Sequence, residues 1–131
     1  MQYPPQLNDA VELLLTRVPN FAKARSEDSS FMSFGRDDSP YLVFGDFAHF
    51  FLQQLQAKEI SKENEGNWLQ ASLHVIDQML TSADPELENL IQVGVLEVLD
   101  GHPDALMLVK SNLSTPSQVK FEQWIRISQQ I

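Results

Sequence analysis

Apolar residues recur along most of the chain at the spacing of one face of an α-helix. The first segment with i, i+3, i+4, i+7 spacing has its apolar positions at Val11, Leu14, Leu15 and Val18. Asn8 is suited to cap its start, and Pro19 ends it because proline lacks the N–H that a helix interior uses. The pattern predicts a helix from about residue 8 to residue 18 and a short second helix over residues 20–26.

Residues 27–40 interrupt this pattern. The stretch is rich in serine, aspartate and glycine, so it predicts a long loop, with one extended turn at residues 31–34. Ser39 and Pro40 then form a helix start, with serine as the cap and proline at the first helical position. Helical spacing continues in an aromatic-rich stripe at Tyr41, Phe44, Ala48, Phe51, Leu52 and Leu55. The alternative is a strand over residues 41–44, but the spacing favours the helix.

The second half contains further helix boundaries. Residues 61–67 predict a turn, and a third long helix follows from Trp68 to about residue 82. Asp84 and Pro85 form the next start, and Gly101 followed by Pro103 forms its end. The apolar run VGVLEVL at residues 93–99 lies between these signals, which enclose about 16 residues, too many for an ordinary strand. The run therefore belongs to a helix.

That helix is apolar around most of its circumference, which is typical of the central helix of a core. Gly94 costs about 1 kcal/mol relative to alanine inside a helix, so we expect a neighbouring helix to approach closely there. A short helix over residues 103–112 follows. The last helix begins at Thr115, where Gln118 three residues on predicts a capping box.

These elements predict one all-α domain over residues 1–131, with six or seven helices in antiparallel pairs. The arrangement is a helical bundle or a short stack that resembles helical repeats, although no internal sequence period establishes repeats. With 131 residues and 43% hydrophobic content, the chain is long enough to bury one sizeable core.

Acidic residues outnumber basic ones by eighteen to nine, which gives a net charge of −9. The basic residues are scattered, so we expect neither nucleic acid nor an anionic membrane as a partner. A basic protein partner fits the charge, although acidity for solubility is the simpler explanation. The chain lacks cysteine, a secretory signal and an apolar run near the roughly 18 residues that span a bilayer. We therefore expect a cytoplasmic protein.

Two histidine–aspartate pairs are the nearest approach to a metal site. His49 follows Asp46 by three residues and Asp77 follows His74 by three, so each pair shares a helix face. Both pairs lack the Glu-x-x-His order and the two further glutamates of a di-iron site. Phosphate-binding glycine loops, nucleophile elbows and dinucleotide fingerprints are absent as well. The sequence thus predicts no catalytic residue, metal or cofactor.

Glu97 is the one carboxylate within the VGVLEVL run. A carboxylate in apolar surroundings costs free energy unless it is paired or protonated. We expect Glu97 to be a buried structural acid that holds a cation, a tryptophan N–H or a free helix start. The alternatives are a side chain that reaches solvent and, least favoured, a general acid, because no catalytic partner is identifiable.

The region from residue 84 to residue 104 holds six acids and neither lysine nor arginine. Most lie at the two ends of the predicted central helix. A solvated surface is the simpler interpretation, and a docking face for a cationic protein is the functional one. On charge pattern alone, the candidate contact residues are Asp37, Asp38, Asp84, Glu86, Glu88, Asp100 and Asp104.

Residues 40–125 contain four features in a fixed order: the segment GDFAHFFLQQL, a long helix, the segment NLIQVGVLEVL and a final helix with tryptophan. In this order the chain resembles small acidic helical bacterial proteins, among them immunity proteins of contact-dependent growth inhibition and related polymorphic toxin systems. The resemblance implies a non-enzymatic cytoplasmic protein that blocks a cognate toxin domain, often a cationic nuclease. The alternatives are an adaptor that binds a cellular protein through an apolar groove, and a metal- or ligand-dependent enzyme using His49 or His74.

Overall fold

The computed structural model describes residues 4–27, 39–56 and 62–129. Its elements are α1 (Pro5–Arg17), α2 (Pro19–Glu27), α3 (Pro40–Gln56), α4 (Lys62–Leu80), α5 (Pro85–Ile91), the π-helical η1 (Gln92–Leu96), α6 (Glu97–Leu99), α7 (Pro103–Ser111) and α8 (Thr115–Gln129). Within these ranges the chain forms no strand, so the predicted all-α helical bundle is confirmed.

Three of these elements form one continuous helix. The backbone is in the right-handed helical region at both junctions, at Ile91 and at Leu96 and Glu97. We call the whole segment, α5 with η1 and α6, the central helix. Counted in this way, the described residues form seven helices, within the predicted six or seven.

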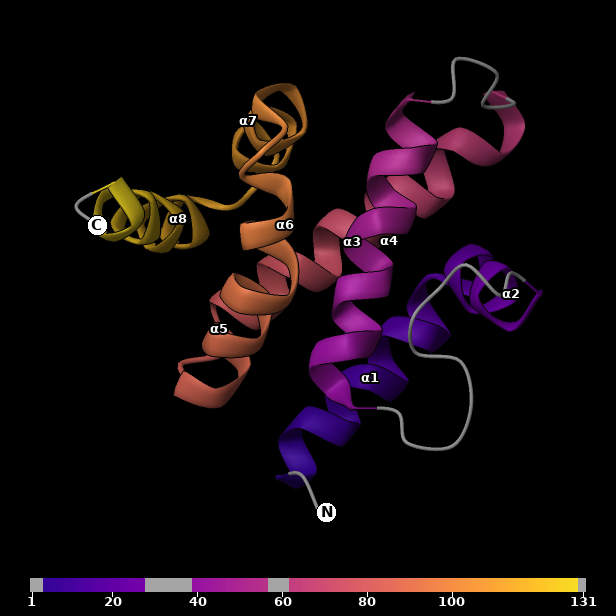
Figure 1. The fold of residues 1–131 in the computed structure, drawn as a ribbon, viewed down its shortest axis with the longest axis horizontal. Coiled ribbons are helices and arrows are strands. Elements are labelled where there is room, and N and C mark those ends of the chain that lie inside the picture. Colours follow the sequence, from indigo (N-terminus) through magenta and orange to yellow (C-terminus); the bar gives the residue numbers. More distant parts are fainter. Residues whose placement is uncertain (1–3, 28–38, 57–61, 130–131) are drawn as a thin grey trace.

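Figure 1 shows the arrangement around α3, with the central helix on one side and α1 and α2 on the other. Helices α7 and α8 lie beyond the carboxyl end of the central helix. The central helix packs most closely on α3 at Gly94, where an added Cβ would lie 3.0 Å from the Cβ of Phe44. The expected close approach at Gly94 is therefore confirmed.

The core is built around the aromatic residues of α3. Phe47 packs edge-on against Phe21 of α2 and Phe51, and Trp68 of α4 packs edge-on against Phe50 and Phe51. All five side chains are buried. Residues 41–44 belong to α3, so the helical interpretation of this segment is confirmed over the strand.

Several helix boundaries differ from the prediction. Helix α1 begins at Pro5, because proline at the first position fits a helix start as well as Asn8 fits a cap. Helix α4 begins at Lys62, within the predicted turn over residues 61–67, because lysine and glutamate favour helix and one glycine costs only about 1 kcal/mol. The side chain of Gln118 donates to the carbonyl of Leu113 at 3.1 Å and not to Thr115. Most of the predicted loop, residues 28–38, lies outside the described residues.

In the described part of the chain, none of the helices combines the length and the apolar character that crossing a bilayer would require.

Candidate functional site

Glu97 is exposed to solvent, so the predicted buried acid at this position is wrong. Val93, four residues before Glu97 and therefore on the same side of the helix, is exposed as well. Within the π-helical turn η1 the N–H of Glu97 donates to the carbonyl of Gln92, five residues earlier, whereas an ordinary α-helix repeats its bonds at four residues.

The buried residues of the central helix recur at both four- and five-residue spacing; Leu90 and Gly94, and Ile91 and Val95, are four apart. Leu90 and Ile91 are buried, and so are Val95 and Leu96, five residues on; Gly94 and Leu99 form the third such pair. On a regular helical wheel Glu97 lies between Leu90, which is buried, and Val93, which is exposed, so Glu97 is at the edge of the buried face.

Among the residues whose burial is described, the buried acid is Asp46 in α3, with only 3% of its surface exposed. Its Oδ2 lies 3.9 Å from Nε of Arg25, which joins α3 to α2. Sequence analysis paired Asp46 with His49, but Asp46 points into the protein and His49 is exposed. Two side chains three residues apart on a helix point in different directions, and here one direction leads into the core and the other to solvent.

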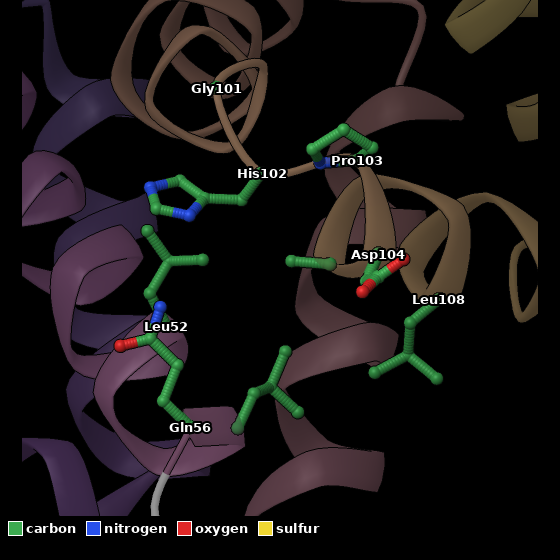
Figure 2. Close-up of a pocket in the computed structure, with 9 residues that line it drawn as sticks. Leu52, Gln56, Gly101, His102, Pro103, Asp104 and Leu108 are labelled. Carbon is green, nitrogen blue, oxygen red and sulfur yellow. The ribbon is translucent and has the colours of Figure 1, made fainter.

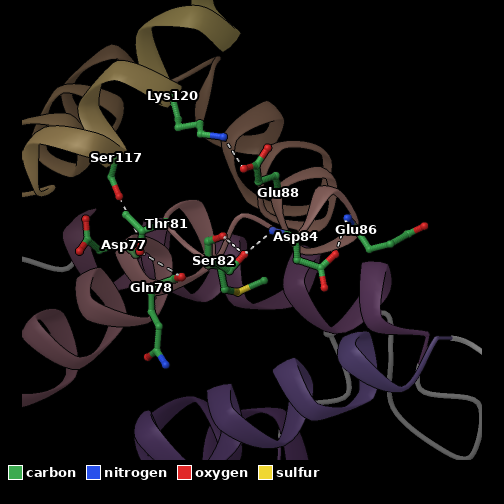
Figure 3. Close-up of polar contacts among 10 residues, drawn as sticks. Asp77, Gln78, Thr81, Ser82, Asp84, Glu86, Glu88, Ser117 and Lys120 are labelled. Atoms are coloured by element: carbon green, nitrogen blue, oxygen red, sulfur yellow. Dashed lines mark hydrogen bonds and ion pairs between the residues drawn. The ribbon is translucent and has the colours of Figure 1, made fainter.

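Asp77 of α4 holds the start of α8. Its Oδ1 accepts hydrogen bonds from the N–H of Ser114 at 2.8 Å and from the hydroxyl of Ser114 at 2.7 Å. The Asp77 carbonyl accepts a third, from the hydroxyl of Ser117 at 3.1 Å (Figure 3). Burial raises the pKa of Asp77, but the nearby hydroxyls of Ser117 and Ser114, the N–H of Ser114 and the charge of His74 outweigh it and lower the pKa below 3.8. Asp77 therefore has the role of clasp that the sequence suggested for Glu97.

Two of the three acids at the amino end of the central helix are engaged by other groups of the fold (Figure 3). Asp84 caps α5 by accepting a hydrogen bond from the N–H of Glu86 at 2.9 Å. Glu88 forms an ion pair with Lys120 of α8, a cation that lies far away in sequence. The Glu86 side chain is exposed. Of these three carboxylates, Glu86 is thus the one turned to solvent.

The acids at the carboxyl end of the central helix are exposed. Asp100 follows α6 directly, and Asp104 lies in the first turn of α7. Neither forms an ion pair with another described residue. Beside them is an open hollow of about 490 Å³, to which α3 contributes Leu52, Leu55 and Gln56 and the α7 region contributes residues 101–105 and 108 (Figure 2).

The predicted contact residues therefore do not share one face. Asp84, Glu86 and Glu88 lie at one end of a helix of about 15 residues, and Asp100 and Asp104 lie past the other, roughly 22 Å away at 1.5 Å per residue. Asp37 and Asp38 lie outside the described residues. The chain thus presents two separate acidic regions, and the one at the carboxyl end has more unengaged charge.

Metal ligands do not gather anywhere in residues 4–27, 39–56 and 62–129: no three His, Asp or Glu side chains there are placed to share an ion. His74 and Asp77 do lie together beside a small polar hollow with Asn112. The carboxylate of Asp77 is already occupied by Ser114. The geometry of this pair accordingly serves the packing of α8 on α4.

A protein-family model described as a domain of unknown function, DUF7674, matches residues 11–129. The match includes every helix described above, in whole or in part. Neither the search of curated proteins nor that of solved structures gave a match to this chain.

Proposed function

We propose a function for this chain, which belongs to the DUF7674 family of domains of unknown function: it is a non-enzymatic immunity protein of the cytoplasm that neutralises a basic toxin domain. One observation carries the proposal. Asp100 and Asp104 are exposed and unpaired among the described residues, and Asp104 lines a hollow whose described lining contains neither lysine nor arginine. Such a surface complements a cationic protein.

The mechanism is occlusion. A net charge of −9 attracts a basic domain over long range and raises its association rate by roughly 10- to 1000-fold. The exposed acids then meet the basic cleft of the toxin and cover its active or target-binding surface. Occlusion requires no catalytic group on this chain.

The candidate contact residues take different roles in this proposal. Asp100 and Asp104 contact the toxin, and Glu86 contributes mainly to the long-range field. Asp84 and Glu88 stabilise the fold, because a helix start and a lysine already engage them. Asp37 and Asp38 keep their predicted role as further contacts.

Affinity capture from the native cells, followed by reconstitution, tests the proposal. We expect capture of a basic domain that arrests growth when expressed alone and is harmless when co-expressed with this protein. The double variant Asp100→Lys, Asp104→Lys should lose protection, whereas Glu86→Lys should keep most of it. Capture of a housekeeping protein, or co-expression that leaves the toxin active, would contradict the immunity function and favour the adaptor.

A further inference from the structure

The hollow at the carboxyl end of the central helix combines an apolar floor with a negative rim. Its floor includes Leu52 and Ala105, which are buried, and Leu55 and Leu108, which are half-buried. In Figure 2 the side chains of Leu52 and Leu108 lie on opposite walls, with His102 and Asp104 above the opening between them. An apolar side chain placed there would remove these leucines from water, which is favourable in proportion to the area covered.

Three features make the rim negative. Helix α3 and the central helix both end here, at Gln56 and Leu99, and the carboxyl end of a helix carries a partial negative charge. Asp104 lines the hollow and adds a full negative charge, and Asp100, which precedes the lining residue Gly101 in the chain, is exposed. Helix α7 begins here as well, but Pro103 supplies no N–H, and Asp104 in the first turn offsets its positive end.

Few positive groups lie near the hollow among the described residues. Its described lining contains one imidazole, His102, and neither lysine nor arginine. The nearest lysine along α7, Lys110, is paired with Glu122 of α8 at 3.1 Å. An anionic ligand would thus meet repulsion, and a neutral one would gain only the apolar contact.

We propose that this hollow is a docking site for an amphipathic, cationic protein segment, whose apolar side chain enters between Leu52 and Leu108 while adjacent lysines or arginines reach Asp100 and Asp104. The inference rests on the proposed function only in naming the toxin as the source of that segment. Shape and charge together select the occupant: the leucines favour an apolar anchor, and the rim rejects an acidic neighbour.

Two synthetic peptides test the site directly. One is an amphipathic peptide of leucine and lysine, and the other is the same peptide with every lysine replaced by glutamate. Titrated into the intact protein, the lysine peptide should shift the amide resonances of residues 52–56 and 101–108 in NMR spectra. The glutamate peptide should bind at least about tenfold more weakly.

Matched charge reversals locate the negative rim. Asp104 and Glu86 are both exposed acids that directly follow the proline opening a helix, so Asp104→Lys and Glu86→Lys change the same kind of position and the same net charge. We expect Asp104→Lys to weaken binding of the lysine peptide about fivefold and Glu86→Lys less than about twofold. Equal losses in the two variants would overturn the site.

A third variant adds bulk at the edge of the hollow without a change of charge. A Cβ at Gly101 would meet open space, and its backbone is outside the left-handed region, so Gly101→Trp places a large ring at the hollow without strain. Binding of the lysine peptide should fall at least about tenfold in this variant. Unchanged binding, resonance shifts away from the hollow, or self-association of the free protein through it would overturn the inference.

The same variants separate this inference from the proposed function. If Gly101→Trp still neutralises the captured toxin but no longer binds the peptide, the immunity function stands and the hollow is not the toxin's docking site. If the hollow binds the lysine peptide as described and no toxin is neutralised, the docking site stands and the immunity function fails.

Discussion

Asp46 and Glu97 are both carboxylates on helices that form the core, but their surroundings differ. Asp46 is buried and faces Arg25, whereas Glu97 is exposed. Removing one member of a buried ion pair leaves the other uncompensated, at a cost of about 3 kcal/mol. We therefore expect Asp46→Ala to lower the free energy of unfolding by about that amount and Glu97→Ala to change it by less than about 0.5 kcal/mol in urea titrations. Comparable losses in the two variants would contradict this assignment.

Asp77 gives the fold a specific pH dependence. Its pKa is lowered below 3.8 in the folded protein, so the carboxylate stabilises the fold above the pKa of the unfolded chain. That contribution is lost as the pH falls through the lower pKa of the folded protein. We expect the wild type to exceed Asp77→Asn in stability at neutral pH, by about 1 kcal/mol for a helix cap, and the difference to shrink below about pH 3.8.

Thermal or urea unfolding of the two proteins over a pH series measures this difference. The asparagine variant is the suitable reference, because its amide oxygen can still accept a bond from Ser114 and only the charge is lost. A gap that stays constant from neutral to acidic pH would show that the ionised form of Asp77 adds nothing to the clasp. Asp9→Asn, an exposed change in α1, controls for a general effect of lost negative charge.

At the scale of the helix, we expect alanine substitutions at two interior glycines to change the stability of the fold in opposite directions. A Cβ at Gly45 in α3 would meet open space, so Gly45→Ala should stabilise the fold by about 0.5–1 kcal/mol through helix propensity. A Cβ at Gly94 would lie 3.0 Å from that of Phe44, which its backbone holds in place. The expected loss for Gly94→Ala is about 1–2 kcal/mol, because overpacking outweighs propensity.

Calorimetric melting temperatures compare the two glycine variants under the same conditions. Gly101→Ala adds a control at an exposed position with open space, where little change is expected. Stabilisation of the protein by Gly94→Ala would mean that α3 moves away easily, and the close packing of α3 on the central helix would then be unimportant for stability.

The helices also show which parts of the fold the sequence could predict. Caps and prolines are local signals, and they located α3, the central helix, α7 and α8 to within a few residues. The π-helical turn at residues 92–96 leaves no such signal in the sequence. The burial of Glu97 was predicted wrongly because its apolar neighbour on the helix, Val93, was counted as core, whereas Val93 is 43% exposed.

The other features that the sequence did not predict are contacts between residues far apart in the chain. Asp77 and Ser114 are 37 residues apart, and Glu88 and Lys120 are 32 apart, so no local pattern joins them. Charge counting found the acids but could not distinguish those engaged by a cap or a lysine from those turned to solvent. The hollow beside Asp104 depends on how α3 and α7 pack, so no local sequence pattern indicates it.

For the molecule as a whole, the net charge of −9 predicts how a basic partner associates. Raising the ionic strength from about 0.01 M to about 1 M shortens the Debye length from about 30 Å to about 3 Å, which removes long-range attraction. We expect the association rate of the captured basic domain, measured by stopped-flow fluorescence, to fall at least about tenfold over this range, while the dissociation rate changes much less.

Charge reversal separates the contribution of the whole field from that of the rim. Glu86→Lys and Asp104→Lys reduce the net charge equally, so both should slow association to a similar, modest extent at low salt. Asp104→Lys should in addition speed dissociation, because its carboxylate lies where the partner is in contact. An association rate that does not change with ionic strength would instead favour an adaptor that binds by apolar contact. A dissociation rate that Asp104→Lys leaves unchanged would show that the contact lies away from the carboxyl end of the central helix.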